Sequence, residues 1–465
     1  MVQYEQPHSY VWPPDYNWMN NNGASNVSQN HYPVTSTEML VPWLLSVWMM
    51  GKAPDDWSNK SKPPKKSNKG FRNEYVGFKD RFTWGQIDLE YPNQESKRMA
   101  RKSGAFIPAN NLPLGIEVWK DKMFLSIPQW KKGIPVTLTS VDLNSNSSSP
   151  RLKPFPDWNW YTTADTDPCR GLVSVFRMQV DKCDRLWVLD TGSIDLAKSV
   201  NQICPTKLDV FNLKTNRHVR RFIFPSAQVS KDSLFTNIVV EIINDNCEDA
   251  FAYMSDVFQY GLVVYNYKMD VSRRIFHPYF YPDPLHCRYH LDNITFHWVD
   301  GIFGMSLSPE SKNRVLYFHA MSSNHEFYVP TSSLRNGTLG SDILDHFVSF
   351  NDSRCHKHEL CQTSASAMDT KGVMYYNVVT TAKIGCWNSR HEFKPSTQGV
   401  LDSGPVQLSF PNDLKVDQEP VQRIWMISNG LHKYLYNKMN PNEINVRVMM
   451  AYTDVVTRGT VCDSR

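Results

Sequence analysis

The sequence predicts an all-β fold, a six-bladed β-propeller that follows a largely disordered N-terminal extension. Three observations support this prediction: a hairpin-like unit recurs six times, the units follow one another at a long spacing, and strand-forming residues dominate each unit. One unit is VFRMQVDKCDRLWVLDTG, residues 175–192, in which two apolar runs flank a polar turn. The aromatic anchors of the six units are Phe124, Trp187, Tyr253, Tyr317, Tyr375 and Trp425.

The spacing of the units favours a closed ring of blades. Consecutive anchors are 63, 66, 64, 58 and 50 residues apart. Because roughly 40 to 50 residues suffice for a four-stranded blade, each unit has room for four strands and long surface loops. A lone hairpin cannot bury its apolar face, so repetition implies that neighbouring units cover one another. We therefore predict one propeller over residues 76–465, closed so that only short edges remain.

Residues 1–75 are predicted to be a low-order extension. Residues 1–37 are rich in Asn, Tyr and Pro, and residues 58–72 form the basic stretch SNKSKPPKKSNKGFR. Between them, MLVPWLLSVWMMG at 39–51 has the apolar length of a signal-peptide core and falls short of the ~20 residues that span a bilayer. Two interpretations stay open: a displaced secretion signal, or a short apolar segment packed on the propeller. No stable membrane span is expected.

Charge and cysteine usage indicate the class of protein. A net charge of +4 without a long basic stripe argues against nucleic acid as a partner. Nine cysteines without a CxxC pair, beside several N-x-S/T triplets, favour a secreted, disulfide-bonded glycoprotein. The odd number leaves at least one thiol unpaired or paired between chains, and the pairing stays open. The predicted glycosylation sites are Asn146, Asn293, Asn336 and Asn351.

Three segments have a distinctive sequence: RLWVLDTG at 185–192, FHWVDGIFGMSLSP at 296–309 and RIWMISNG at 423–430. They resemble segments of the insect yellow and major royal jelly protein family, its yellow-type members above all. The resemblance extends from about Phe82 to Arg447 and implies a secreted six-bladed propeller. It also implies a range of roles, because some members are tied to cuticle pigmentation and melanin, some convert dopachrome, and salivary relatives in blood-feeding flies bind biogenic amines in the channel.

A ligand site is predicted at the channel mouth, where the first strand of each unit begins and the second ends. If the first strands are innermost, short polar side chains converge there in an otherwise apolar concavity. An aspartate can pair with an ammonium group, and Phe176, Phe235 and Phe303 can clamp an aromatic ring. Alternatively, these polar residues only cap turns and strand ends. The candidate residues are Asp190, Thr191, Asp256, Asn377, Ser428 and Asn429, with Ser126 at the equivalent position of the first unit.

Metal and catalytic sites have weaker support. CHKHELC at 355–361 and HCRYH at 286–290 gather Cys and His without the spacing of zinc sites. Glu117, Asn237 and Asp369 could imitate the calcium ligands of other six-bladed propellers. We predict no metal, no cofactor and no assigned catalytic residue, since nucleophile, zinc-protease and nucleotide motifs are absent from the sequence. The candidates for a general base are His277, His286, His290, His297 and His319.

Three functional hypotheses follow. The leading one is a secreted, extracellular yellow-family protein of pigmentation or catecholamine metabolism that binds a small aromatic amine or catechol in its channel. The second is a dopachrome-converting isomerase. The third is a structural or signalling glycoprotein of the cuticle, whose outer loops at 140–165 and 324–362 bind an extracellular partner.

Overall fold

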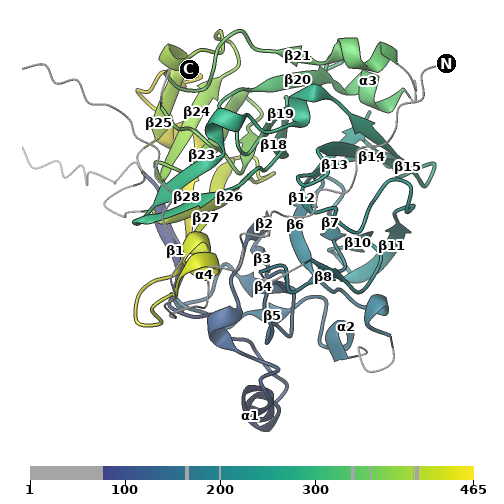
Figure 1. Ribbon diagram of the computed structural model, residues 1–465, viewed down its shortest axis with the longest axis vertical. Helices are drawn as coiled ribbons and strands as arrows, with labels where there is room; N and C mark the ends of the chain where they lie inside the picture. The colour runs from purple at the N-terminus through teal and green to yellow at the C-terminus, as the bar shows by residue number, and fades with distance from the viewer. Residues whose placement is uncertain are drawn as a thin grey trace, which may run out of the picture. The chain divides into compact units, whose positions relative to one another are not determined.

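The computed structural model describes residues 77–465, except 163–166, 198–199, 337–340, 357–358, 402 and 404–407. Six four-stranded antiparallel sheets dominate these residues and form the blades of a β-propeller (Figure 1). The predicted extension at 1–75, with the apolar run at 39–51, lies outside the described residues.

The first three blades follow one another along the chain. The first contains β2 (Gly115–Trp119), β3 (Lys122–Ser126), β4 (Leu138–Asp142) and β5 (Lys153–Pro154). The second contains β6 (Val175–Val180), β7 (Arg185–Asp190), β10 (Lys207–Asn212) and β11 (Arg217–Ile223), with the short hairpin β8 (Ser193–Ile194) and β9 (Asn201–Gln202) beside it in the chain. The third contains β12 (Phe235–Ile243), β13 (Asn246–Asp256), β14 (Gly261–Asn266) and β15 (Val271–Phe276).

A two-stranded hairpin separates the third blade from the last three. It consists of β16 (Arg288–Leu291) and β17 (Ile294–His297). The fourth blade contains β18 (Ile302–Leu307), β19 (Val315–Ala320), β20 (Phe327–Pro330) and β21 (Val348–Ser349). The fifth contains β22 (Ser366–Met368), β23 (Val373–Val378), β24 (Lys383–Asn388) and β25 (Gln398–Leu401). The sixth contains β26 (Phe410–Val416), β27 (Arg423–Asn429), β28 (Val446–Tyr452) and β1 (Lys79–Trp84).

The inner strands close a ring. Strand β6 contacts β2 and β12, β18 contacts β12 and β22, and β26 contacts β22 and β2. The first strand of each unit is therefore the innermost, which meets the condition on which the predicted ligand site depends. All six aromatic anchors lie in the second strands, from Phe124 in β3 to Trp425 in β27. The outermost strand of the sixth blade is β1, which precedes the first blade in sequence and pairs with β28 (Phe82 opposite Val448).

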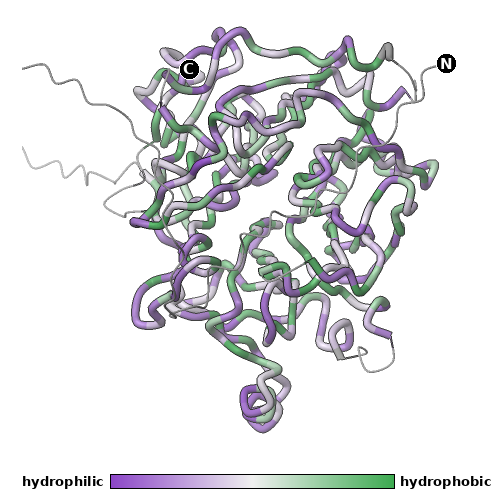
Figure 2. Tube along the Cα trace, in the orientation of Figure 1, coloured by the Kyte–Doolittle hydropathy of each residue, from purple (hydrophilic) through white to green (hydrophobic). Residues whose placement is uncertain are grey.

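Apolar side chains fill the spaces between neighbouring blades. Trp187 and Leu189 of the second blade pack with Ile238 and Ala252 of the third, and all four are buried. Burying an aliphatic or aromatic side chain stabilises the fold by about 1.5 to 3 kcal/mol, so this packing is a main source of stability. Hydrophilic residues are frequent on the peripheral helix α1 (Gln94–Ser103), none of whose residues is buried (Figure 2).

The other helices are short, and all except α5, which follows the last strand, lie between strands. The α-helices are α2 (Asn159–Thr162), α3 (Thr331–Arg335), α4 (Leu431–Tyr436) and α5 (Thr453–Val456). The 3₁₀ helices are η2 (Pro108–Asn110), η4 (Pro168–Arg170), η5 (Pro278–Phe280), η6 (Pro284–His286), η7 (Ser341–His346) and η8 (Pro395–Thr397). Among the described residues, none of the helices is long and apolar enough to cross a membrane.

The expectation of long outer loops at 140–165 and 324–362 was wrong. The first segment holds β5 and α2, and the second holds β20, α3, η7 and β21, which complete the first and fourth blades. Their strands have only two to four residues, too few to produce an alternating pattern that sequence can reveal.

Four disulfides use eight of the nine cysteines. The pairs are Cys169–Cys204, Cys183–Cys247, Cys355–Cys361 and Cys386–Cys462. The ninth, Cys287, carries a free thiol. Disulfides of this number are typical of proteins that fold in an oxidising compartment.

Candidate functional site

The predicted mouth residues lie at one end of the propeller axis, which we call the channel mouth. Asp190 ends β7 and Asp256 ends β13, opposite the first residues of β6 and β12. Asn429 ends β27, opposite the first residue of β26. All six candidates, including Thr191, Asn377 and Ser428, are at most 3 % exposed.

Backbone groups occupy the carboxylate of Asp190. It accepts hydrogen bonds from the amides of Val173 (2.7 Å), Ser174 (2.8 Å) and Gly192 (3.0 Å). It also forms a buried ion pair with Lys207, 3.1 Å away. Asp190 thus holds the segment that enters β6 against the end of β7.

The other candidates have similar partners. Asp256 accepts from the amide of Leu234 (3.0 Å) and pairs with Arg274 (2.9 Å). The side-chain oxygen of Asn377 accepts from the amide of Ala365 (2.8 Å). Thr191, Ser428 and Asn429 each hydrogen-bond to backbone groups as well. These contacts are those of strand-end caps, and a ligand contact by any of the six stays a prediction.

Four inner strands carry a β-bulge close to the mouth. The register slips between Val175 and Met178 in β6, and similar slips in β12, β18 and β26 leave Thr236, Phe303 and Asn412 without a cross-strand partner. A bulge adds one residue and re-aims its side chain, and bulges are frequent beside functional sites. Here they direct side chains toward the propeller axis. We call Phe176, Arg177, Phe303, Asn412 and Asp413 the axial cluster.

Arg177 organises the axial cluster. Its guanidinium pairs with Asp413 (2.7 Å) and donates to the carbonyl of Asn412 (2.7 Å). It also lies 5.6 Å from the ring centres of both Phe176 and Phe303. Those two rings are 6.0 Å apart although their strands, β6 and β18, are not neighbours in the ring, so they meet across the axis. All five residues are buried, and the cluster therefore fills the axis at this level.

Of the three predicted aromatic clamps, the structure brings two together. Phe176 and Phe303 meet in the axial cluster. Phe235 instead stacks on Phe224, 5.7 Å away, in the core between the second and third blades.

The suggested calcium ligands link inner strands instead of gathering around one point. Glu117 accepts from the amides of Val118 (3.0 Å) and Val180 (3.1 Å), which joins β2 to β6. Asn237 donates to the carbonyl of Phe303 and joins β12 to β18. Asp369 binds amides of the turn between β22 and β23. Burial raises the pKa of Glu117 to about 7 against the opposing effect of Lys415 and the two amides.

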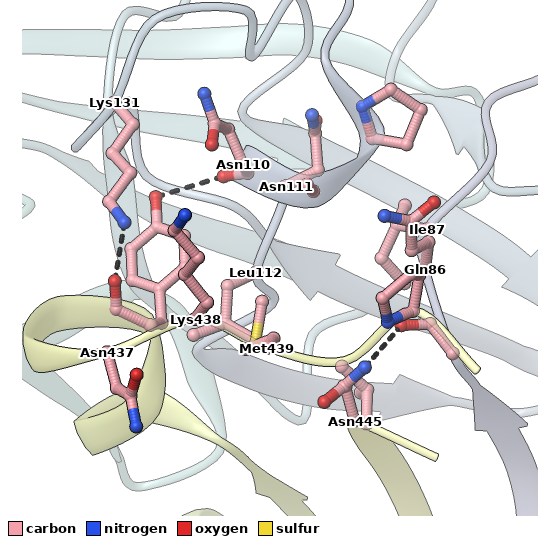
Figure 3. A pocket seen from close by; sticks show the side chains of 16 residues that line it. Gln86, Ile87, Asn110, Asn111, Leu112, Lys131, Asn437, Lys438, Met439 and Asn445 are labelled. Carbon is pink, nitrogen blue, oxygen red and sulfur yellow. Dashed lines mark hydrogen bonds between the residues drawn. The ribbon is translucent and has the colours of Figure 1, made fainter. Parts of the chain in front are cut away.

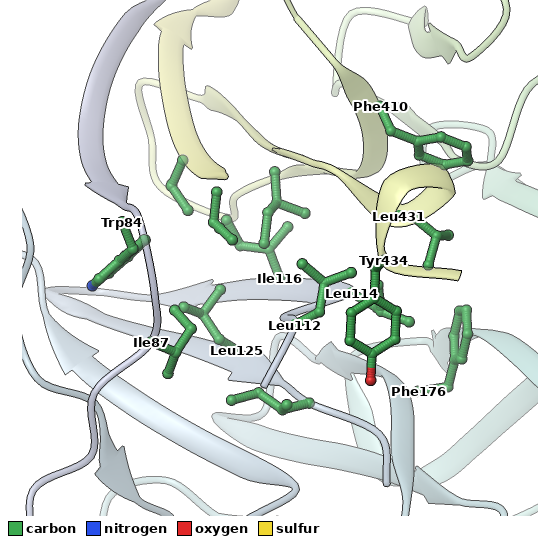
Figure 4. Close-up of a cluster of buried hydrophobic side chains, with 14 of the residues drawn as sticks. Trp84, Ile87, Leu112, Leu114, Ile116, Leu125, Phe176, Phe410, Leu431 and Tyr434 are labelled. Atoms are coloured by element: carbon green, nitrogen blue, oxygen red, sulfur yellow. The ribbon is translucent and has the colours of Figure 1, made fainter. Parts of the chain in front are cut away.

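A structure that we call the cover lies over the channel mouth and consists of the β16–β17 hairpin and α4. The Trp298 indole donates to the Tyr436 hydroxyl (2.6 Å), and Phe296 stacks on the Tyr436 ring. At the hairpin tip, Asp292 pairs with Lys433 of α4 (2.7 Å). Figure 4 shows buried side chains around α4, among them Phe176 and Phe410 of the inner strands.

Asp300 is a carboxyl group at the channel mouth that has no hydrogen-bond donor or cation as a partner among the described residues. It lies two residues before the start of β18 and is partly exposed. Among the described residues, its carboxylate accepts no hydrogen bond and forms no ion pair. Burial raises the pKa of Asp300 to about 7. Shifted pKa values of this kind cluster at functional sites, and a carboxyl group that titrates near neutrality can bind a cation or accept a proton.

The surroundings of Asp300 combine polar and aromatic groups of the cover. The Ser322 hydroxyl donates to the carbonyl of Trp298 (2.8 Å) and accepts from the amide of Asp300 (3.2 Å). The Tyr289 hydroxyl lies 3.0 Å from that of Ser322. Burial raises the pKa of both Cys287 and Tyr289, and the charge of Asp300 raises both further. Asp300 therefore lies among groups that stay neutral at physiological pH.

The histidines offer less to a ligand. Both ring nitrogens of buried His319 are used, by the carboxylate of Glu326 (2.9 Å) and the carbonyl of Thr363 (3.1 Å). His277 caps η5 and stacks on Phe347. His286 pairs with Asp283, exposed His290 contacts Thr295, and His297 is exposed at the end of β17.

The Cys- and His-rich segments differ in their thiols. Cys355 and Cys361 lie close to Glu359, but their sulfurs form a disulfide and cannot act as thiolate ligands of zinc. Cys287 keeps its thiol, which donates to the carbonyl of Asp283.

Sequence reasoning missed Asp300 although it lies within FHWVDGIFGMSLSP. The signal that could have revealed Asp300 is the sequence at the end of the second strand of the fourth blade. That strand ends in Ala320 at the position that Asp190, Asp256 and Asn429 occupy elsewhere. The second strand of this blade therefore ends without a polar side chain, and the acidic residue at the mouth is Asp300, in the segment before β18.

Comparisons with known proteins show which family the chain resembles. A family model described as "Major royal jelly protein" matches residues 173–462. Protein yellow of Drosophila madeirensis is 36% identical over 393 residues, which cover 83% of this chain and 68% of the relative. Dopaminechrome tautomerase of Drosophila melanogaster is 36% identical over 395 residues, which cover 82% of this chain and 83% of the relative.

Among solved structures, the selenomethionine-substituted virginiamycin B lyase from Staphylococcus aureus is similar at 11% identity with a TM-score of 0.40. The match covers 74% of this chain and 95% of the lyase. The family match and the Drosophila relatives show that the chain belongs to the major royal jelly protein family, which includes the yellow proteins.

Proposed function

We propose that this member of the major royal jelly protein family binds a small aromatic amine or catechol derivative at the channel mouth. The observation that carries the proposal is Asp300, a desolvated carboxyl group without a partner among the described residues. A ligand ammonium group is its natural complement, because charge-assisted hydrogen bonds are the strong ones. Trp298 is partly exposed and packs against the apolar cluster that contains buried Tyr289 and Phe303, so its ring is the aromatic surface proposed for the ligand body.

The proposed biological setting is pigmentation or catecholamine metabolism. Its support is the similarity to protein yellow and to dopaminechrome tautomerase, whose name refers to an oxidised catecholamine. In this proposal, the six predicted mouth residues shape the wall of the site by holding the strand ends, and Asp300 contacts the ligand.

We further propose a secreted, extracellular glycoprotein. Four disulfides support an oxidising compartment. A cuticular or other extracellular partner remains the structural alternative. The predicted glycosylation sites are exposed and lie outside the strands: Asn146, Asn293, Asn336 and Asn351.

Calorimetric titration with tyramine, dopamine and serotonin tests the binding proposal. We expect these amines to bind and 4-ethylphenol, which lacks the amine, to bind much more weakly. Asp300→Asn should weaken amine binding by about 10- to 100-fold, since a hydrogen bond to a charged group is worth about 1.5 to 3 kcal/mol. Wild-type affinity should rise as the pH increases through about 7, because the Asp300 carboxyl then ionises.

Asp121→Asn is the matched control. Asp121 is an exposed aspartate in the turn between β2 and β3, away from the mouth, and its replacement should leave amine affinity unchanged. The absence of binding by all three amines at millimolar concentration would refute the proposal. So would an Asp300→Asn protein with wild-type amine affinity.

Conversion of an aminochrome is the second candidate function. A carboxyl group with a pKa of about 7 suits proton transfer near neutral pH, and tautomerisation needs proton transfer without a redox cofactor. The purified protein should then accelerate the loss of visible absorbance of dopaminechrome relative to a boiled sample, and Asp300→Asn should abolish the acceleration. Equal rates with native and boiled protein would leave binding as the function.

A further inference from the structure

A separate pocket lies between the segment after β1, η2 and α4, and none of its lining residues belongs to the axial cluster. Its walls come from residues 85–87 after β1, residues 108–112 around η2, Lys131, and residues between Tyr434 in α4 and Val446 in β28. We call it the rim pocket (Figure 3). Its volume is about 210 Å³, less than the roughly 300 to 1,000 Å³ of pockets for drug-sized ligands. A ligand of about one ring with a short side chain is therefore the appropriate size.

The rim pocket is cationic. Its lining contains two lysines, Lys131 and Lys438, and no Asp or Glu. Figure 3 shows both lysines on the same side of the pocket. The remaining polar lining residues carry side-chain amides: Gln86, Asn110, Asn111, Asn437 and Asn445.

The Lys131 ammonium lacks a counterion. It donates to the carbonyl of Tyr434 and lies 3.8 Å from the centre of the Tyr434 ring, but forms no ion pair within the described residues. An ammonium group has three donors, so others stay available. Burial lowers the pKa of Lys131, which reflects the cost of keeping its charge half-buried without a nearby anion. A bound anion would remove that cost.

Two further features of the rim pocket limit the chemical class of its ligand. Ile87, Leu112 and Val446 form an apolar part of the wall. Asn111 is 3 % exposed, its NH₂ group donates to the carbonyls of Ile107 (2.8 Å) and Gly133 (2.9 Å), and its side-chain oxygen is buried without a partner. Leaving such an acceptor unpaired costs about 1 to 3 kcal/mol, which a ligand hydroxyl or N–H would recover.

We propose that the rim pocket binds a small carboxylic acid with an apolar body and one hydrogen-bond donor. The carboxylate pairs with Lys131 and Lys438, the body packs on the apolar wall, and the donor reaches the oxygen of Asn111. This ligand carries the opposite charge to the amine proposed for the channel mouth. The two sites are therefore expected to differ in the charge of the ligand that they prefer.

Three probes with one phenol body test the proposal by titration of the full chain: 4-hydroxyphenylacetate, its neutral amide, and tyramine. We expect 4-hydroxyphenylacetate to bind at least tenfold more tightly than the amide. Lys131→Gln should weaken its binding tenfold or more, whereas Lys131→Arg should retain binding because it keeps the charge. Lys132→Gln is the matched control, since Lys132 is the exposed neighbour outside the pocket lining.

Thermal unfolding of each variant would show that it is folded before titration. Testing both variants with both probes distinguishes the rim pocket from the channel mouth. Asp300→Asn should weaken the binding of tyramine and leave the binding of 4-hydroxyphenylacetate unchanged. Lys131→Gln should weaken the binding of 4-hydroxyphenylacetate and leave the binding of tyramine unchanged. The rim proposal is overturned if the acid and its amide bind equally, if the acid fails to bind at millimolar concentration, or if folded Lys131→Gln binds it as the wild type does.

Discussion

The second and fourth blades each place an aspartate at the channel mouth, and the two carboxylates have opposite environments. Asp190 accepts three backbone hydrogen bonds and pairs with buried Lys207. Asp300 has no hydrogen bond or ion pair on its carboxylate among the described residues, and burial raises its pKa to about 7. Asp190 lies in the more conspicuous sequence motif, yet its binding capacity is already used by the protein.

The contrast separates two uses of one residue type. A buried carboxylate with full hydrogen bonding fixes a strand end and contributes to stability. A desolvated carboxyl group without a partner costs stability and is available to a ligand. Replacement of Asp190 should therefore lower the stability of the protein, whereas replacement of Asp300 should raise it.

The largest effect is expected for Asp190→Ala. Removal of one member of a buried ion pair leaves Lys207 charged and unpaired, and three amides lose their acceptor. We expect the free energy of unfolding to fall by about 3 to 5 kcal/mol, measured by chemical denaturation.

The control for this experiment is Asp121→Ala, at an exposed turn, which should change stability by no more than about 0.5 kcal/mol. A loss of similar size in Asp121→Ala and Asp190→Ala would contradict the structural role assigned to Asp190.

A smaller effect of opposite sign is expected for Asp300→Asn. Because the folded pKa of about 7 lies above the unfolded value near 4, the contribution of Asp300 to wild-type stability is greatest below about pH 4 and is lost as the pH rises to about 7. Asparagine does not titrate, so this loss disappears. At pH 8 the variant should be more stable than the wild type by on the order of 1 to 2 kcal/mol, allowing for the partial exposure of Asp300.

Denaturation of both proteins between pH 4 and 8 measures this difference. Parallel stability curves for wild type and Asp300→Asn would show that the carboxyl group is not desolvated. That result would contradict the contrast drawn between the environments of Asp190 and Asp300.

Sequence predicted the fold well because each blade repeats a strong local signal. An aromatic anchor in a buried second strand recurs in all six blades, from Phe124 to Trp425, and burial enforces it each time. The outer strands escaped prediction since strands as short as β5 and β21 carry no periodic pattern. The pairing of β1 with β28 escaped because it joins distant parts of the chain.

The site was only partly predictable. The six predicted polar residues lie at strand ends and stay a prediction as ligand contacts, and two of the three predicted aromatic residues, Phe176 and Phe303, meet on the axis. Sequence reasoning had no means to recognise the bulges, because a bulge adds one residue to an apolar run without changing its composition. The availability of Asp300 depends on tertiary neighbours, since only the folded chain reveals which carboxylates acquire partners.

The closure of the sixth blade has a consequence for the timing of folding. Lys79 pairs with Met450, so about 370 residues are synthesised after β1 before its partner exists, which takes roughly 20 to 75 seconds at ordinary translation rates. During that interval Phe82 and Trp84, both buried in the finished ring, have no β28 to cover them. Among the described residues, the first strand to be made is thus among the last to acquire its neighbour.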